Sequence, residues 1–213
     1  MIKNRTFQLV FQTIYIAFGI IGILASVDFF EHRFDSVFYV YFTNLSNYLC
    51  IGIMFFELLQ TAKKRRNSYV SFNPCLKFVG VIAIIITALV FNIILAPTRD
   101  VVRNFSVESI LLHIVLPFMF VLDWILFYKR RRCKWYYPFV SLLSPLIYII
   151  FIYVRGYLVN FNPSTPELFP YFFLDFTKLG VGGVARWFLL FGIGFFVLSY
   201  GVYFIDRIFK SRS

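Results

Sequence analysis

The sequence has few of the side chains that usually carry enzyme chemistry. Among 213 residues it has two histidines, three cysteines and ten acidic residues. It has no G-x-S-x-G elbow of a serine hydrolase, and the stretch Gly180–Gly183 lacks the lysine and the Ser/Thr of a phosphate-binding loop. A zinc site needs three or four converging ligands, and a bis-histidine haem needs paired axial histidines. The chain offers neither pattern, so we expect no metal and no organic cofactor.

Apolar residues dominate instead. The chain is 60% hydrophobic and 22% aromatic, with a mean hydropathy of +0.78, whereas soluble domains average about 45–50% apolar. Six apolar segments, each long enough to cross a bilayer as a helix, lie at about residues 7–27, 38–59, 76–95, 110–128, 136–153 and 187–204. The first is longer than the apolar part of a signal peptide and lacks a clear cleavage site, so we expect it to be retained. We predict an all-α polytopic membrane protein in which residues 1–213 form a single six-helix domain.

The basic residues predict the orientation. Fifteen of the 21 Lys and Arg residues lie in the amino terminus, the second and fourth connections and the tail, and six lie in the other three connections. By the positive-inside rule both termini are cytoplasmic. The same rule explains the net charge of +11 better than nucleic-acid binding, which needs a basic face with interleaved aromatic residues, so we expect no nucleic-acid partner.

The positions of the remaining polar residues support further expectations. The three cysteines are too scattered for a disulfide framework, so we expect three free thiols. Glu57, Asp123 and Asp206 stand near the cytoplasmic ends of spans, where we expect them to pair with the basic runs. The Phe-, Ile- and Lys-rich composition suggests a multi-pass protein of a bacterial plasma membrane, with membrane lipids around it. The oligomeric state stays open.

Polar residues within the spans collect near one membrane face. At 1.5 Å per residue, Thr43 lies about 7 Å below the outer end of the second span and His113 about 5 Å below that of the fourth. Asn92 reaches the same layer from the third span, Asn47 lies one turn below Thr43 on the same helix face, and Asn44 falls in that turn. Polar side chains inside a bilayer are costly and usually functional, so this layer is the candidate site.

A long connection is expected to cover this layer. Residues 155–186 contain an Asn-Pro-Ser-Thr-Pro stretch, Pro170 and Gly180–Gly183, which argue against a continuous helix. We expect an extracytoplasmic cap, part of it aromatic enough to lie on the membrane surface. Arg155 and Asp175 approach the polar layer from this segment, and Pro117 and Pro145 are expected to kink the fourth and fifth spans.

The residue types in this layer suit acyl transfer. A Thr hydroxyl beside a neutral His can act as a nucleophile while the His takes its proton, and amide or backbone N–H groups can stabilise the oxyanion. A structural interpretation stays open beside this one, because Thr, Ser and Asn in membrane helices commonly bond to backbone carbonyls or to neighbouring helices. His113 could equally be a buried hydrogen-bond partner.

Three short motifs carry a resemblance to a known family. They are Phe42-Thr43-Asn44-Leu45, the run from His113 to Phe118, and the run from Pro170 to Asp175. With these motifs most of the chain resembles the androgen-induced-gene-one-like and androgen-dependent TFPI-regulating protein family, as a bacterial-type six-span member. The resemblance implies a threonine hydrolase that cleaves fatty acid esters of hydroxy fatty acids, with Thr43 and His113 in the two essential roles. In the animal members the His stands five residues before the Pro, and here it stands four.

We therefore expect an intramembrane lipid esterase with Thr43 as the nucleophile and His113 as the base. Its partner is a lipid or fatty-acid ester substrate. Asn44, Asn47, Asn92, Arg155 and Asp175 are the expected substrate-binding or orienting residues. The alternative is a noncatalytic membrane protein that binds or transports a lipid or a small amphiphile in the same polar pocket.

Overall fold

The computed structural model describes residues 4–32, 34–35, 37–63, 71–98, 104–158 and 169–208. Within these ranges the chain is helical and has no strand. Six helical stretches are long and apolar enough to cross a membrane: Arg5–Ser26, Phe42–Lys63, Pro74–Thr98, Val107–Phe127, Tyr137–Leu158 and Phe176–Ile208. The prediction of an all-α, six-span membrane fold is therefore confirmed.

The spans are built from the following elements. The α-helices are α1 (Arg5–Ser26), α2 (Phe42–Lys63), α3 (Pro74–Val90), α5 (Val107–Ile110), α6 (Leu116–Phe127), α7 (Tyr137–Ser141), α8 (Leu143–Leu158) and α9 (Phe176–Ile208). Two π-helical turns, Phe91–Leu95 and Leu111–Val115, extend α3 and precede α6. Short 3-10 turns stand at Phe29–Glu31, Phe38–Val40, Ala96–Thr98 and Phe172–Leu174.

Local sequence signals set the starts of several helices. The Asn4 side chain accepts the backbone N–H of Phe7 at the start of α1, and Asn73 accepts those of Cys75 and Leu76 at the start of α3. Such caps satisfy backbone donors that have no partner in the first helical turn. Pro74 follows Asn73 at the first helical position, where proline is favoured because its missing N–H costs nothing.

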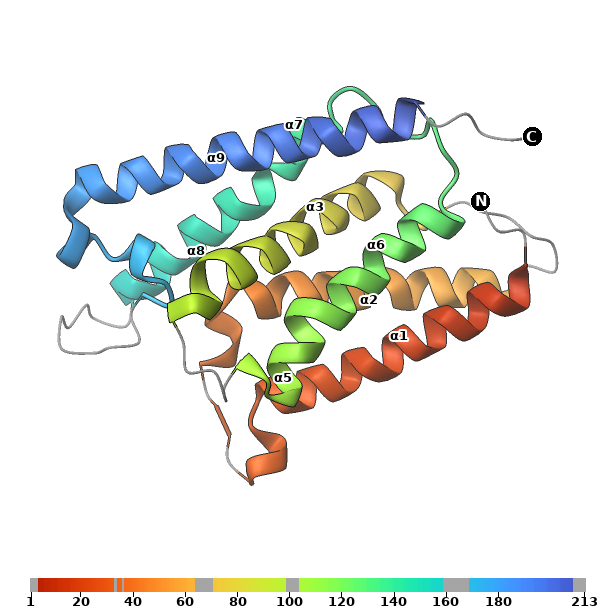
Figure 1. Cartoon of the computed structure of the whole chain (residues 1–213), viewed down its shortest axis with the longest axis horizontal. Helices are drawn as coiled ribbons and strands as arrows, with labels where there is room; N and C mark the ends of the chain where they lie inside the picture. Colours follow the sequence, from red (N-terminus) through yellow and green to blue (C-terminus); the bar gives the residue numbers. More distant parts are fainter. Residues whose placement is uncertain are drawn as a thin grey trace.

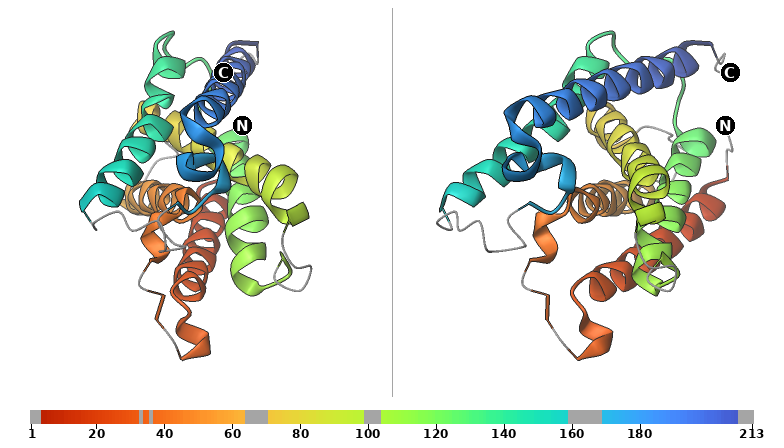
Figure 2. Two further views of the ribbon diagram at one scale, coloured as in Figure 1. Left: turned by 90° about the vertical axis from the view of Figure 1, so that its left-hand side faces the viewer. Right: turned by 60° about the vertical axis from the view of Figure 1, so that its left-hand side comes forward.

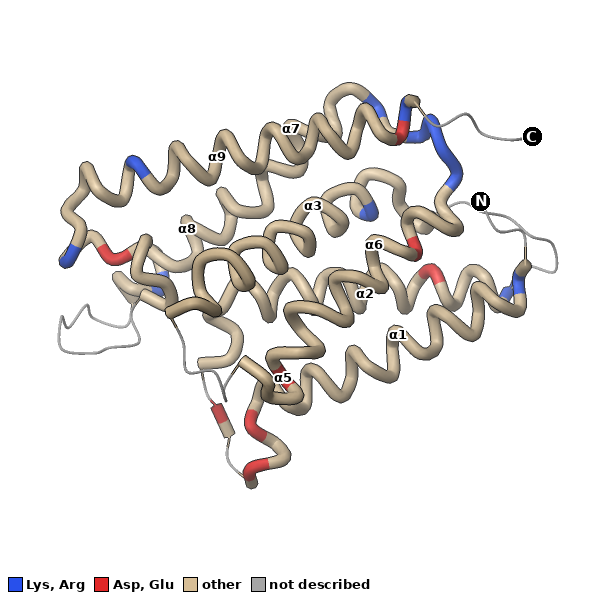
Figure 3. The backbone as a smooth tube through the Cα atoms, in the orientation of Figure 1, with Lys and Arg blue, Asp and Glu red and all other residues tan. Residues whose placement is uncertain are grey.

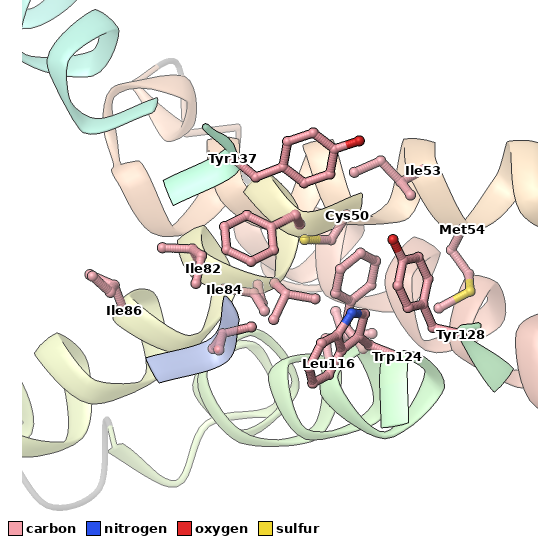
Figure 4. Packing of buried hydrophobic residues seen from close by; sticks show 14 of the residues in the cluster. Cys50, Ile53, Met54, Ile82, Ile84, Ile86, Leu116, Trp124, Tyr128 and Tyr137 are labelled. Carbon is pink, nitrogen blue, oxygen red and sulfur yellow. The ribbon is translucent and has the colours of Figure 1, made fainter. Parts of the chain in front are cut away.

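The third span lies at the centre of the bundle. α3 packs against α2, α6, α7 and α9, while α1 packs against α2 and α6. Figure 1 shows the long helices running along roughly one direction, and Figure 2 shows the same bundle from two other sides. The main core lies between these helices, and Figure 4 shows Cys50 and Met54 of α2 packed in it together with Leu116 and Trp124 of α6. The three cysteines are free thiols, as predicted.

Both prolines expected to disturb their spans do so, in different ways. Pro117 is the second residue of α6, which begins directly after the π-helical turn Leu111–Val115. A residue without an N–H tolerates the altered register there at no cost in backbone hydrogen bonds. The span that holds Pro145 is divided at Leu142 into α7 and α8.

The sixth span begins earlier than predicted. α9 starts at Phe176, so the expected start near residue 187 is wrong, whereas the expected interruption of the helix is confirmed at Gly180, where two helical segments meet at a kink. Only Gly180 leaves the helical conformation, with φ 65° and ψ 168°, a region that glycine occupies without a steric penalty. The Asn-Pro-Ser-Thr-Pro stretch of the expected cap lies outside the described residues, and the described part of the cap is Phe169–Asp175.

Charged residues separate the two ends of the bundle. α1 begins and α9 ends at one end, which we call the basic end, and most of the basic residues gather there (Figure 3). The expectation that Glu57 and Asp123 pair with the basic runs is wrong, because both pair with Lys77 inside the bundle. Asp206 does meet a basic run, through the backbone N–H of Cys133, 3.0 Å from its Oδ2.

Candidate functional site

A large apolar cavity lies between α2, α3, α8, α9 and the Phe169–Asp175 segment. Its volume is about 670 Å³, within the range of about 300–1,000 Å³ that is usual for small-molecule sites. Among its lining residues, Leu146 of α8 and Leu189 and Ile193 of α9 are more than half exposed (51%, 67% and 56%). The side formed by α8 and α9 therefore reaches the outer surface of the bundle, where lipid would lie.

Four hydroxyl side chains belong to the wall of this cavity, and two of them make hydrogen bonds to other groups of the protein. The Tyr148 hydroxyl donates to the carbonyl of Val40 at 2.9 Å, and the Thr87 hydroxyl lies 2.7 Å from that of Ser46. The other two belong to Thr43 and Tyr171, which lie near each other. The polar corner of the cavity is therefore the Thr43–Tyr171 pair.

The amino terminus of α2 creates this corner. Phe42 and Thr43 are the first two residues of α2, and their backbone N–H groups lie near the Tyr171 oxygen. Burial raises the pKa of Tyr171, and the nearby Thr43 side chain and these backbone groups lower it in part. First-turn N–H groups together with the positive end of the helix dipole favour oxygen atoms that carry negative charge. An oxyanion would be stabilised in the same place.

His113 lies next to the cavity wall, on the far side of Phe91. The imidazole stacks on the Phe91 ring with centroids 3.4 Å apart, and Phe91, unlike His113, lines the cavity. The Nδ1 atom lies 3.0 Å from the carbonyl of Ser109. A carbonyl only accepts, so the neutral imidazole carries its hydrogen on Nδ1 and has its lone pair on Nε2. Both residues of the stack belong to π-helical turns, which recur at functional sites.

Hydrogen bonds connect the residues of the predicted polar layer, and Asn47 connects the helix of Thr43 with the span of His113. The Asn47 amide donates to the carbonyl of Thr43 at 2.9 Å and to that of Leu112 at 3.0 Å. Asn92 donates to the carbonyls of Ala88 at 2.8 Å and of His113 at 3.3 Å. These bonds place Thr43 and His113 at the same depth. They also occupy both N–H bonds of each amide, so the structure gives Asn47 and Asn92 a bridging geometry.

The other expected orienting residues lie around the cavity without lining it. The buried Asn44 donates to the carbonyl of Phe38 at 2.7 Å and fixes the turn before α2. Arg155 lies in the last turn of α8 and contacts Tyr39, with its Nε 3.4 Å from the phenol oxygen. Asp175 caps α9, because its Oδ1 accepts from the backbone of Thr177 at 3.0 Å and of Lys178 at 3.3 Å.

Tyr171 and Lys77 are the two polar residues of interest that the sequence analysis did not single out. Tyr171 stands in a Phe-rich run, and its hydroxyl was the available signal. Lys77 is the second residue of an apolar run, and in the sequence analysis it counted only among the basic residues that predict the orientation.

The chain matches no protein-family model, no curated protein and no solved structure. The resemblance drawn from its three motifs stays a prediction.

Proposed function

We propose that this chain is an intramembrane lipid esterase in which Thr43 is the nucleophile and His113 is the base. One observation carries the proposal: the Thr43 hydroxyl lies at the wall of a large apolar cavity, beside the first-turn N–H groups of a long helix. The cavity suits an acyl chain, and the polar corner suits the ester group. Fatty acid esters of hydroxy fatty acids are the substrates implied by the motif resemblance.

The reaction proceeds in two steps with no outside reactant except water. The Thr43 oxygen attacks the ester carbonyl while its proton passes to Nε2 of His113, and the oxyanion lies against the N–H groups of Phe42 and Thr43. The ester C–O bond then breaks, and the alcohol leaves with the proton from His113. Water attacks the acyl-threonine, His113 takes the water proton, and the acid leaves as Thr43 regains its hydrogen. For this transfer the Phe91 ring has to move from between His113 and the cavity.

The experiment compares turnover by purified protein on a panel of lipid esters that includes a fatty acid ester of a hydroxy fatty acid. We expect wild type to turn over, Thr43→Ser to keep measurable activity, and Thr43→Ala and His113→Ala to lose it by about 10²–10⁴-fold or more. Thr87→Val is the matched control, because it removes another hydroxyl from the same cavity wall and should leave turnover intact. Equal turnover in Thr43→Ala and wild type would overturn the mechanism.

A second function, the binding of an amphiphile without chemistry, is favoured by the Phe91 stack. The ring contacts the imidazole at 3.4 Å and presents an apolar surface to the cavity. This function predicts that lipid is retained through purification but never hydrolysed, and that Thr43→Val leaves the amount retained nearly unchanged.

Under either function we propose that the protein lies in a bacterial plasma membrane with both termini cytoplasmic. The composition and the distribution of basic residues support this placement.

A further inference from the structure

A buried cluster of charges lies far from the cavity, in the half of the bundle near the basic end. The Lys77 ammonium lies 2.8 Å from Oε2 of Glu57 and 2.6 Å from Oδ2 of Asp123. The Lys77 side chain is 1% exposed, and those of Glu57 and Asp123 are 6% and 4% exposed. Thr43 and Glu57 belong to the same helix and are about 21 Å apart at 1.5 Å per residue, so this cluster is separate from the proposed esterase site.

The charges in the cluster do not balance. Within the described part of the chain two carboxylates face one ammonium, which leaves one uncompensated negative charge inside a membrane bundle. The other titratable groups among the described residues that face the cluster are Tyr15 of α1, Cys50 of α2 and Tyr128, all neutral at neutral pH. Arg5 reaches the edge of the region, but its guanidinium bonds to the carbonyls of Thr61 and Ala62 at the end of α2. A net charge in low dielectric is costly, and a buried group usually responds by changing its protonation state.

The hydrogen bonds show which carboxyl can accept a proton. Glu57 uses both oxygens, since Ser71 donates to Oε1 and Lys77 to Oε2. Asp123 uses only Oδ2, and its Oδ1 has no partner among the described residues. A proton on Asp123 therefore displaces no existing hydrogen bond, whereas a proton on Glu57 would.

Gln12 supplies an independent observation at the same level. Its side chain is 0% exposed, and neither amide atom has a hydrogen-bond partner in the described part of the chain. Ring contacts pair Tyr15 with Phe120 and Phe11 with Phe127, so α1 and α6 run antiparallel here. Gln12 lies between Phe11 and Tyr15 on α1, and Asp123 lies between Phe120 and Phe127 on α6. The antiparallel register thus places an unpartnered amide oxygen level with the unpartnered Asp123 oxygen.

A small gap connects the cluster with polar residues of the basic end. It is lined by the three charged residues of the cluster and by Gln8, Thr61, Ser71, Phe127 and Tyr128. Its volume of about 20 Å³ admits a single water, which needs about 10–15 Å³. Among the described residues no group of three or more His, Cys, Asp or Glu side chains is arranged so that it could hold a metal ion. A proton delivered by water therefore fits this site, whereas a coordinated metal ion does not.

We propose that Asp123 is a proton-binding site that exchanges its proton with water from the basic end of the bundle. A proton from solvent at the basic end reaches the water in the gap, and this water passes a proton to Asp123 and is left as neutral water. A new O–H bond forms at Oδ1 of Asp123, and the charge of the cluster changes from one negative to zero. Lys77 stays protonated and Glu57 stays ionised. The new O–H group of Asp123 donates a hydrogen bond to the Gln12 amide oxygen or to the water in the gap.

The test is infrared spectroscopy of the purified full chain in a detergent without carbonyl groups. At neutral pH wild type should show the C=O stretch of one protonated carboxyl group, which shifts in D₂O and on ¹³C labelling of aspartate but not of glutamate. Asp123→Asn should lose the band. Glu57→Gln should lose it as well although Asp123 is still present, because the cluster is then neutral without a proton. Lys77→Met should show two such carboxyl groups.

Asp206→Asn is the matched control, because Asp206 is another fully buried aspartate in a span and stands outside the cluster. The band should persist in this variant. Its persistence in folded Asp123→Asn or in Glu57→Gln, its shift with labelled glutamate, or its loss in Asp206→Asn would overturn the proposal. If Asp123→Asn fails to fold, the Glu57→Gln spectrum and the isotope labels decide.

Discussion

At the scale of single residues, the polar groups of this bundle act in pairs that bridge different helices. Asn47 is completely buried and ties the carbonyl of Thr43 on α2 to that of Leu112 beside His113. Asn92 makes a weaker link of the same kind, at 3.3 Å to the carbonyl of His113 and on an exposed position. The two residues that the esterase proposal needs are thus held at one depth mainly by a single amide.

We predict that Asn47→Leu lowers the free energy of unfolding by about 0.6–1.7 kcal/mol, because it removes one cross-helix hydrogen bond, and such bonds in membranes contribute about 0.6 kcal/mol on average and up to about 1.7. Thermal unfolding in detergent measures the effect. Asn92→Leu is the comparison and should cost less, since its bond to the neighbouring helix is longer. Equal losses in the two variants would contradict the bridging role of Asn47.

Asp175 gives a prediction with a defined pH dependence. Burial raises the pKa of Asp175, but hydrogen bonds from the hydroxyl and backbone of Thr177 and from the backbone of Lys178 outweigh it, so the pKa lies below its usual value. A lowered pKa means that the carboxylate stabilises the fold above the unfolded pKa of about 3.9, and that this stability is lost as the pH falls through the folded value.

Asp175→Asn keeps a side-chain oxygen that can cap the helix, because Asn and Asp are about equally good caps, and it removes the negative charge. It should therefore lower the unfolding temperature at neutral pH by a free-energy loss of about 0.3–1 kcal/mol, the usual effect of a charge at a helix end. The difference between wild type and variant should shrink as the pH falls below about 4. Melting curves of both proteins across this pH range provide the measurement, and a difference that grows on acidification would be the wrong sign.

At the scale of elements, apolar runs and proline predicted the spans, while the sixth span shows the limit of that method. Glycines at positions 180, 182 and 183 resembled a loop, yet only Gly180 leaves the helix. The number of glycines in the sequence suggested a loop, but a single residue with positive φ is enough to change the direction of the backbone before a long helix. The cap over the cavity is accordingly shorter than predicted, and its described part lies close against Thr43 through Tyr171.

Gly180→Ala should cost about 1–3 kcal/mol, because a residue with a Cβ at φ 65° and ψ 168° is strained. No atom lies within 4 Å of the added carbon, so the cost is in the backbone alone. Gly194→Ala is the matched control in the same helix, also with open space around it. There the change should be neutral or stabilising, and chemical unfolding of both variants compares the two sites.

At the scale of the whole molecule, the sequence predicted the layer that holds Thr43, Asn47, Asn92 and His113 because depth follows from counting residues along a helix. It could not predict which side chains in a layer touch, since that depends on how each helix is rotated about its axis. For this reason Phe91 beside His113, Tyr171 beside Thr43, and Lys77 between two carboxylates emerged only from the packed bundle.

The cavity itself yields the last prediction, which tests lipid binding without assuming any chemistry. Gly192 of α9 lines the cavity, and a carbon added there meets no atom within 4 Å. Gly194, two residues along the same helix, also has open space around it but is not among the residues that line the cavity. A Trp side chain buries about 150–250 Å², so at position 192 it would take up space that a bound acyl chain needs.

Gly192→Trp should therefore reduce the amount of lipid that copurifies with the protein severalfold, whereas Gly194→Trp should retain it. Native mass spectrometry in detergent counts the bound lipid, and melting curves show that both variants fold. If the two variants retained equal lipid, the cavity between α8 and α9 would not be the place where lipid binds. If only Gly192→Trp lost it while turnover was absent in wild type, binding without hydrolysis would be the function of the cavity.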